Sequence, residues 1–136
     1  MRLYLVRHAE AAQGSTDELS PLTPAGREQA RALAARLRAE GVRPNAIVTS
    51  PLVRARETGT LLGRELGIEP DVDARLAPGA TAASVTEAID GRGETVIVVG
   101  HQPDCSRIAA ALTQGPEPAF PPAGAIPITV PARSVT

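Results

Sequence analysis

A short apolar run that stops at an arginine and a histidine is the feature of this sequence that most constrains its fold. Residues 3–6 read Leu-Tyr-Leu-Val and are followed directly by Arg7 and His8. A continuous apolar run of this length, bounded by polar residues, is typical of a strand buried on both faces of a parallel sheet. Since open α/β sheets bind ligands at the carboxyl ends of their strands, we predict that Arg7 and His8 form one wall of a site.

The rest of the chain alternates between helical and strand patterns. We predict further strands at residues 46–48, near residue 72, at 95–99 and at 125–130, and helices that begin at residues 24, 51, 81 and 103. Thr23-Pro24 and Ser50-Pro51 each place a hydroxyl residue before a proline, a typical helix start. Pro127 assigns the last strand to an edge of the sheet. The alternation predicts one α/β domain over residues 1–136, a three-layer sandwich around a mostly parallel sheet, with a frayed tail at 131–136.

Composition excludes several classes of protein. The 136 residues carry a net charge of −1, which argues against a general nucleic-acid or membrane-surface binder. Tyr4 and Phe120 are the only aromatic residues, so the platforms on which single-stranded nucleic acid stacks are missing. No window approaches a membrane span, and no leader segment is recognisable. We therefore expect a cytoplasmic monomer without nucleic-acid or membrane partners.

Four side chains suited to phosphate chemistry follow predicted strands. Arg7 and His8 follow the first strand, Arg54 lies in the first turn of the helix predicted from Pro51, and His101 follows the strand at 95–99. A cation is disfavoured in the first turn of a helix unless it shares that end with an anion. Each side chain alone has an ordinary structural explanation, but their joint position at one edge of one sheet predicts a phosphate site.

Other chemistries fit the sequence less well. Two histidines could begin a metal site, but no carboxylate or cysteine lies at ligand spacing to either of them, so no metal is expected. Cys105 is the only cysteine, and it falls on the apolar stripe of its predicted helix, where a buried side chain is a better interpretation than a nucleophile. No phosphate-binding loop of the nucleotidase type and no Gly-x-Ser-x-Gly elbow occurs.

Four segments in order resemble the histidine phosphatase superfamily, whose signature is an Arg-His-Gly motif after the first strand. The matching segments are Leu-Val-Arg-His-Ala-Glu at 5–10, Pro-Leu-Thr-Pro-Ala-Gly-Arg-Glu-Gln-Ala at 21–30, Ser-Pro-Leu-Val-Arg-Ala-Arg-Glu-Thr at 50–58 and Val-Gly-His-Gln-Pro at 99–103. Ala9 and Glu57 replace the family's glycine and glutamine. The resemblance implies a phosphoglycerate mutase-like fold. It also implies that His8 is the phosphorylated nucleophile, and that the substrate-binding residues are Arg7, Arg54, Gly100, His101 and Gln102.

The residue types fit this chemistry without a cofactor. A neutral imidazole is nucleophilic near pH 7, and its phosphoramidate is labile enough to be hydrolysed. Two guanidinium groups and a second imidazole can neutralise the charge on the phosphoryl oxygens.

One departure from the family pattern bears on the substrate. Many members place a glutamate after the third strand as the acid for an alcohol leaving group, but residues 75–80 read Arg-Leu-Ala-Pro-Gly-Ala. An alkoxide leaves poorly because its parent acid has a pKa near that of water, about 15.7, whereas imidazolium has a pKa of about 6.5. In its missing glutamate and its small size the chain resembles the SixA-type phosphohistidine phosphatases. This resemblance implies a partner protein that carries phosphohistidine.

Two alternatives stay open. The first is a phosphomonoesterase acting on a small phosphorylated molecule, with Glu10, Asp104 or another loop carboxylate as acid; a shifted loop would offer Asp73 or Glu87. The second is a catalytically silent phosphate-binding module, against which the intact His8 argues.

Overall fold

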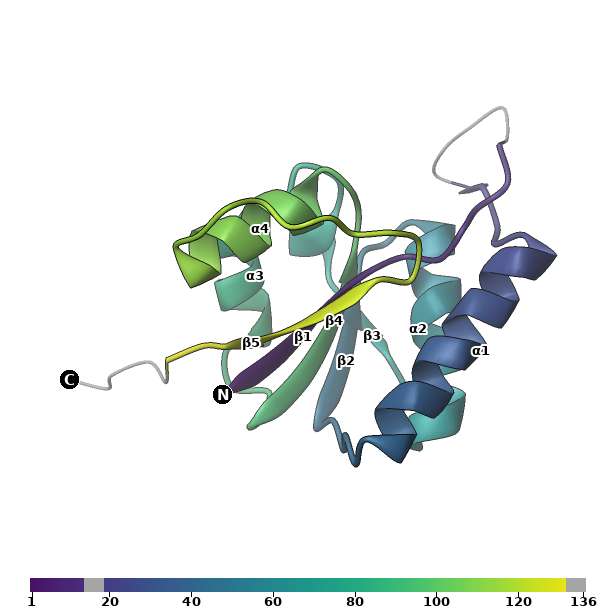
Figure 1. Ribbon diagram of the computed structural model, residues 1–136, viewed down its shortest axis with the longest axis horizontal. Helices are drawn as coiled ribbons and strands as arrows, with labels where there is room; N and C mark the ends of the chain where they lie inside the picture. Colours follow the sequence, from purple (N-terminus) through teal and green to yellow (C-terminus); the bar gives the residue numbers. More distant parts are fainter. Residues whose placement is uncertain (14–18, 132–136) are drawn as a thin grey trace.

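One five-stranded sheet runs through the described part of the chain, which comprises residues 1–13 and 19–131 of the computed structural model (Figure 1). Its strands are β1 (Arg2–Arg7), β2 (Ala46–Thr49), β3 (Asp71–Val72), β4 (Thr95–Gly100) and β5 (Ala125–Thr129), in the spatial order β3-β2-β4-β1-β5. The pairs β1–β4, β4–β2 and β2–β3 are parallel, and β5 pairs with β1 in the antiparallel direction. The predicted mostly parallel sheet is therefore confirmed.

The buried strands supply two cores at once, because successive side chains of a strand point to opposite faces. Leu3 and Leu5 pack in the core under helices α3 (Ala82–Ile89) and α4 (Asp104–Thr113). The intervening side chains of β1 pack under helices α1 (Pro24–Ala39) and α2 (Val53–Leu66). Figure 1 shows these two helix pairs on opposite faces of the sheet, so the chain forms the predicted three-layer sandwich.

The ends of two helices differ in how well they follow the sequence pattern. At α1, Thr23 is the N-cap and its hydroxyl accepts the backbone N–H of Gly26 at 2.9 Å, as expected. Helix α2 begins at Val53 and not at Pro51, because the residue before it, Leu52, is still extended. Ser50 accepts the backbone N–H of Leu52 at 3.3 Å, but its hydroxyl also contacts a histidine. The prediction that Ser50 caps a helix from Pro51 was therefore wrong by two residues.

The remaining predictions can be placed on the described chain. The expected short strand near Val72 is β3, and it is followed by a 3-10 turn, η2 (Ala74–Leu76), that the pattern did not predict. The last strand, β5, lies at the sheet edge with Pro127 opposite Tyr4, as predicted. Of the tail predicted to fray, only Pro131 is described; residues 132–136 lie outside the described residues.

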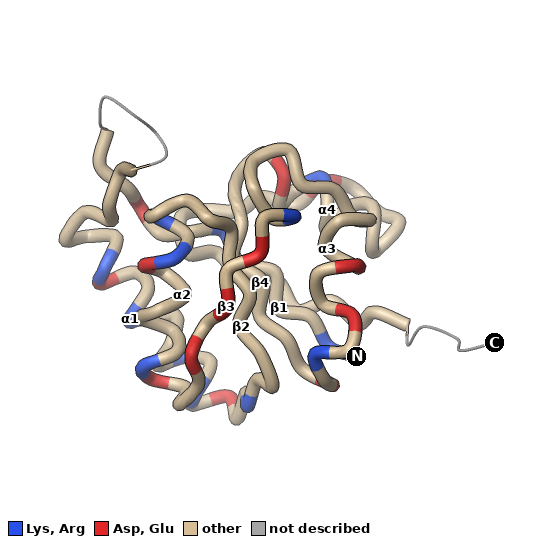
Figure 2. The backbone as a smooth tube through the Cα atoms, turned by 180° about the vertical axis from the view of Figure 1, so that it is seen from behind, with Lys and Arg blue, Asp and Glu red and all other residues tan. Residues whose placement is uncertain are grey.

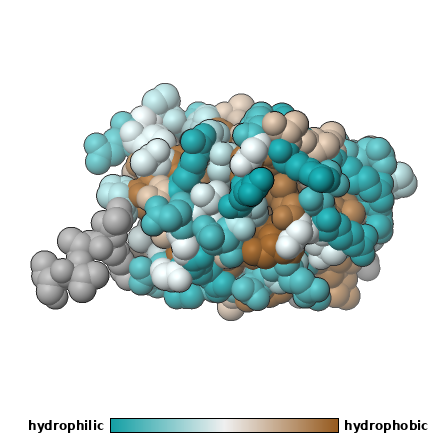
Figure 3. All heavy atoms as spheres, turned by 90° about the horizontal axis from the view of Figure 1, so that it is seen from below, coloured by the Kyte–Doolittle hydropathy of each residue, from teal (hydrophilic) through white to brown (hydrophobic). Residues whose placement is uncertain are grey.

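The surface matches the mixed charge of the sequence. Acidic and basic residues are interspersed along α1 and α2 (Figure 2). Viewed from the end at which β1, β2 and β4 begin, the surface is mainly hydrophilic, with hydrophobic residues showing near its middle (Figure 3). No helix within residues 1–13 and 19–131 is long and apolar enough to cross a membrane.

Candidate active site

The carboxyl ends of β1 and β4 bring the two histidines together. The backbone N–H of His8 donates to Gly100 at 3.0 Å, and the His8 carbonyl accepts from Ala123 at 3.2 Å. These bonds hold the residue after β1 between the end of β4 and the loop before β5. The ring centroids of His8 and His101 lie 5.3 Å apart. Gly100, predicted as a substrate-binding residue, thus contributes the carbonyl that fixes the His8 backbone.

The hydrogen bonds of His8 fix where its proton lies. Nδ1 is 2.7 Å from the Ala9 carbonyl oxygen, which can only accept, so Nδ1 carries the proton. Nε2 is 3.2 Å from Nε of Arg54, which can only donate, so Nε2 holds the lone pair. Burial lowers the pKa of His8, and the charges of Arg54 and Arg7 lower it further, against the bond to Ala9 that raises it. His8 is therefore a neutral imidazole with its lone pair on Nε2.

Arg54 is held by a threonine of the same helix. The Thr58 hydroxyl donates to the Arg54 carbonyl at 2.8 Å and accepts the backbone N–H of Ala9 at 3.0 Å. Thr58 is fully buried, so this hydroxyl ties the first turn of α2 to the chain just after His8. Thr58 lies within the 50–58 motif, but the sequence alone assigns it no role. Its two hydroxyl bonds fix the backbone of Arg54 relative to that of Ala9, while the Arg54 side chain can still turn.

Two buried nitrogens of the site have no hydrogen-bond partner among the described residues. Arg7 donates from Nη1 to the Phe120 carbonyl at 2.8 Å, but its Nε has no hydrogen-bond partner. His101 contacts the Ser50 hydroxyl through Nε2 at 2.5 Å, and its Nδ1 has no partner. Within the described ranges, these are the only buried side-chain nitrogen or oxygen atoms left unpaired. Buried polar atoms are nearly always paired, so two unpaired nitrogens at one sheet edge point to a ligand with acceptor oxygens.

The electrostatics of His101 are those of a neutral ring. Its pKa is lowered to about 4, mainly by burial and further by the proximity of His8 and Arg54. Its side chain is 3% exposed. At neutral pH the site therefore has two positive charges, on Arg7 and Arg54, and two uncharged imidazoles.

The side chain of Gln102 forms its hydrogen bonds with Ser106. Its side-chain amide donates to the Ser106 hydroxyl at 2.7 Å, and its carbonyl accepts the Ser106 backbone N–H at 2.9 Å. The residue therefore caps the first turn of α4, while it also lines a cavity with His101. A substrate-binding role for Gln102 stays a prediction.

Two cavities meet at Arg54. One, of about 600 Å³, is polar and contains Arg7, His8 and Glu10. The other, of about 820 Å³, contains His101 and has a largely apolar wall made of Leu19, Pro51, Leu52, Val53, Ala77 and Pro78. A further cavity of about 530 Å³ between α2 and β3 contains none of the four predicted phosphate ligands. The four side chains predicted to bind phosphate therefore lie where a polar cavity and a more apolar one adjoin.

Of the carboxylates considered as acids, one lines a cavity of the site and the others lie outside. Glu10 lines the cavity of His8, and its carboxylate accepts from the Thr23 hydroxyl at 3.0 Å. Asp104 is buried and accepts the backbone N–H of Gly79 at 2.7 Å, so it fixes the 77–79 loop. Neither cavity that includes Arg54 is lined by Asp73, Glu87 or Asp104.

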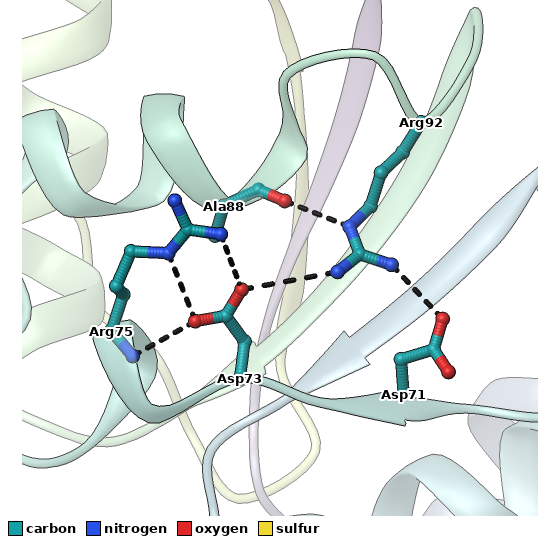
Figure 4. A network of polar contacts seen from close by, with 5 residues as sticks. All are labelled: Asp71, Asp73, Arg75, Ala88 and Arg92. Carbon is teal, nitrogen blue, oxygen red and sulfur yellow. Dashed lines mark hydrogen bonds and ion pairs between the residues drawn. The ribbon is translucent and has the colours of Figure 1, made fainter.

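Asp73 is held in a separate network of charges (Figure 4). It accepts three bonds from Arg75, at 2.8 to 3.0 Å, and Arg92 lies 3.8 Å away on its other side. Arg92 in turn donates to Asp71 at 2.9 Å. The hydrogen bond from Arg75 is the main reason why the pKa of Asp73 is lowered. A carboxyl group that stays ionised and is bound to two arginines is unsuited to donate a proton.

The remaining candidates have structural roles. The Cys105 thiol is fully buried, its Sγ lies 3.7 Å from the Val6 carbonyl, and burial raises its pKa to about 12. The interpretation as a buried side chain therefore fits better than that of a nucleophile. The described residues contain no group of three or more His, Cys, Asp or Glu side chains that could hold a metal ion.

Comparison with known proteins agrees with this geometry. An α/β fold with two histidines and two arginines at one sheet edge defines a site for phosphoryl groups. Residues 3–78 match the model of the histidine phosphatase superfamily, branch 1. The chain is 37% identical over 123 residues to an uncharacterized protein of Picosynechococcus sp. (strain ATCC 27264 / PCC 7002 / PR-6), covering 85% of this chain and 74% of that protein. The chain therefore belongs to the histidine phosphatase superfamily.

Two further matches carry an activity in their names. The chain is 27% identical over 125 residues to phosphohistidine phosphatase SixA of Escherichia coli (strain K12), covering 87% of this chain and 78% of that protein. The structure of the protein histidine phosphatase SixA complexed with tungstate superposes with a TM-score of 0.87 at 26% identity, covering 95% of this chain and 88% of that one. This chain is thus similar to SixA in sequence and in fold.

Proposed function

We propose that this protein is a phosphohistidine phosphatase that removes phosphoryl groups from histidine of a partner protein through a phosphohistidine intermediate on His8. The observation that carries the proposal is the wall beside His101, where Ala77 and Pro78 stand in the loop at which many family members carry their acid. The four side chains expected to bind phosphate are present, and no carboxylate of the described residues lines the cavity that contains His101 to protonate an alkoxide. The similarity to SixA supports the same substrate class.

The first chemical step is an attack by Nε2 of His8 on phosphorus. Arg54 donates to the Nε2 lone pair in the structure, so substrate must draw this guanidinium onto the phosphoryl oxygens before the attack. The bond from phosphorus to the partner's imidazole nitrogen breaks as the new N–P bond forms. When the other ring nitrogen of the partner's histidine carries a proton, the imidazole leaves as a neutral molecule. No acid from the enzyme is then required.

The second step reverses the roles with water as the attacking group. The proton on Nδ1 of His8, held by the Ala9 carbonyl, allows Nε2 to leave phosphorus as a neutral imidazole. Arg7 and Arg54 balance the charge that spreads over the phosphoryl oxygens. In the first step the phosphoryl group passes from one imidazole to another, and in the second step an imidazole leaves again. Neither step therefore depends on a carboxylic acid. Metal independence follows as a prediction, which turnover in the presence of EDTA tests.

The proposal is tested by turnover of a protein that carries phosphohistidine. Rapid quench during turnover is expected to trap a base-stable, acid-labile phosphoryl group on the enzyme, and His8→Ala is expected to abolish both the trapped group and the turnover. An enzyme that leaves phosphohistidine intact but hydrolyses an alkyl phosphate would contradict the proposed substrate class. Retention of near-wild-type turnover by His8→Ala would contradict the assigned nucleophile.

A small-molecule phosphomonoesterase is the second candidate, and Glu10 is the observation in its favour. Glu10 lines the same cavity as His8, so its carboxyl group is placed where a substrate could meet it. If Glu10 is the acid, Glu10→Gln should slow alkyl phosphates far more than phosphohistidine. If it is not, the substitution should change both rates by similar small factors.

A further inference from the structure

The buried hydroxyl of Ser50 has no role in the proposed chemistry, yet it touches the second histidine of the site. Its Oγ lies 2.5 Å from Nε2 of His101. Ser50 is fully buried and follows β2 directly, and its backbone N–H donates to Val99 of the neighbouring strand β4 at 3.0 Å. Since both Ser50 and His101 are fixed by the sheet, this contact is built into the edge at which substrate binds.

Counting donors and acceptors shows whether Ser50 or His101 donates in this hydrogen bond. The Ser50 oxygen already accepts the backbone N–H of Leu52 at 3.3 Å. If Ser50 donates its proton to Nε2 of His101, both hydroxyl bonds are used and only an N–H at Nδ1 stays unpaired. If Nε2 donates to Ser50 instead, the buried hydroxyl proton has no acceptor and the buried Nδ1 lone pair has no donor. The first arrangement leaves one buried polar group unsatisfied and the second leaves two, so the first is favoured.

The favoured arrangement also suits an anion. With Nε2 occupied by Ser50, any bond from His101 to substrate must come from Nδ1, the atom that lacks a partner within the described chain. An N–H at Nδ1 donates to a phosphoryl oxygen while the ring stays uncharged. A lone pair at Nδ1 would repel that oxygen, and protonating it is unfavourable because burial lowers the pKa of the ring.

We propose that Ser50 is a positioning residue that holds His101 in the Nδ1–H tautomer, so that the neutral imidazole donates a hydrogen bond to the phosphoryl group. The inference rests on the proposed function for the identity of the anion, but the tautomer itself is a property of the free protein. In water the opposite tautomer of neutral histidine, with the proton on Nε2, predominates. Ser50 therefore has a defined effect that can be measured without turnover.

Nitrogen NMR on protein labelled with ¹⁵N in its two histidines tests the tautomer directly. Long-range correlations between the carbon-bound ring protons and the two ring nitrogens identify the protonated nitrogen. In the His8→Asn variant only the signals of His101 remain, which assigns them. At pH 7.5 we expect the His101 proton on Nδ1. A wild-type spectrum with the proton on Nε2 would overturn the inference, whether or not any variant folds.

Substitutions then test the role of the hydroxyl. Ser50→Ala is expected to shift His101 toward the Nε2–H form, to weaken binding of inorganic phosphate and to lower kcat/KM at least tenfold, as expected for losing a preorganised donor. Ser50→Thr keeps the hydroxyl and should restore the tautomer. Thr49→Val is the matched control, because it removes a neighbouring buried hydroxyl that bonds only the Ser50 carbonyl. A Ser50→Ala protein with unchanged tautomer and phosphate affinity would refute the assignment. Absence of phosphohistidine turnover in the wild type would count against the proposed function alone.

Discussion

At the scale of single residues, the site works by fixing protons before substrate arrives. The Ala9 carbonyl on one side of His8 and the Arg54 guanidinium on the other leave one arrangement of the ring proton. A histidine free in solution samples both tautomers and, near its pKa, both charge states. Burial and the two neighbouring arginines lower the pKa of His8 and so favour the neutral ring, which is the form that the proposed attack on phosphorus requires.

Arg54 and Arg56 offer a matched pair of substitutions. Arg54 bonds His8, whereas Arg56 is exposed and lies two residues further along α2, about 200° around the helix axis. Arg56 also lines the cavity that contains His101, but it makes no hydrogen bond to either histidine. We expect Arg54→Ala to lower kcat about a hundredfold to a thousandfold, the usual cost of one donor to a transition-state oxygen. Arg56→Ala should change kcat only slightly. Similar small effects of both substitutions on steady-state kinetics would argue against Arg54 as a phosphate ligand.

The lowered pKa of His101 makes stability depend on pH. Between about 4 and 6.5 the unfolded chain binds a proton at this histidine that the folded protein does not bind, so stability falls as the pH is lowered through this range. A lowering from 6.5 to about 4, at about 1.4 kcal/mol per unit, corresponds to roughly 3 kcal/mol. Urea unfolding of wild type and His101→Gln at several pH values measures this contribution. Because the pKa of His8 is lowered too, the variant should lose part of the slope; equal slopes would contradict a buried neutral His101.

At the scale of elements, the loop after β1 and the start of α1 are packed without space for a side chain. A Cβ added to Gly26 would lie 2.0 Å from the Glu10 carbonyl oxygen. That carbonyl accepts the backbone N–H of Thr23 at 3.0 Å, and the Glu10 N–H donates to Gln29 at 2.9 Å. Helix α1 therefore holds the backbone two residues after His8.

Gly26→Ala tests this joint. The added methyl must push α1 away from the loop, and we expect a loss of about 1–3 kcal/mol of stability, typical of overpacking, together with reduced turnover. Gly115→Ala is the control, since its Cβ would meet only Thr113 at 3.5 Å, an ordinary contact. Thermal unfolding of both variants gives the comparison. An unchanged melting temperature for Gly26→Ala would mean that the loop yields easily and does not position His8.

The elements were largely predictable from the sequence, and the contacts between them were not. Runs of apolar residues placed β1, β2 and β4, and Thr23-Pro24 placed the start of α1, because these signals are local. Ser50-Pro51 carries the same local signal, yet Leu52 is still extended and α2 begins at Val53. The Ser50 hydroxyl also contacts His101, which is 51 residues away. The same limit applies to Thr58 and to the Phe120 carbonyl. Their roles depend on which loops the sheet brings together, and no spacing in the chain encodes that.

At the scale of the whole molecule, the sheet edge separates two kinds of surface around one phosphate site. The polar cavity contains His8 and Arg7, and the apolar one contains His101, Ala77 and Pro78. Asp104 fixes the loop that forms part of the apolar wall. Outside this wall, Arg75 and Arg92 keep the carboxylate of Asp73 ionised. Among the described residues no carboxylate lines the apolar cavity, because contacts elsewhere in the fold hold Asp104 and Asp73. A leaving group that needs no acid is therefore the main chemical consequence of the proposed function.

The rate of phosphoenzyme formation across substrates of graded leaving-group pKa tests this claim most directly. Without an acid, each unit of leaving-group pKa adds up to about 1.4 kcal/mol to the barrier, so the rate should fall steeply from phosphoimidazole through aryl phosphates to alkyl phosphates. Rapid-quench measurement of the burst on His8 isolates this step from hydrolysis. We expect a steep dependence, because the leaving group receives no proton from the enzyme. A rate that hardly changes along the series would reveal an acid in the site and would contradict the proposed substrate class.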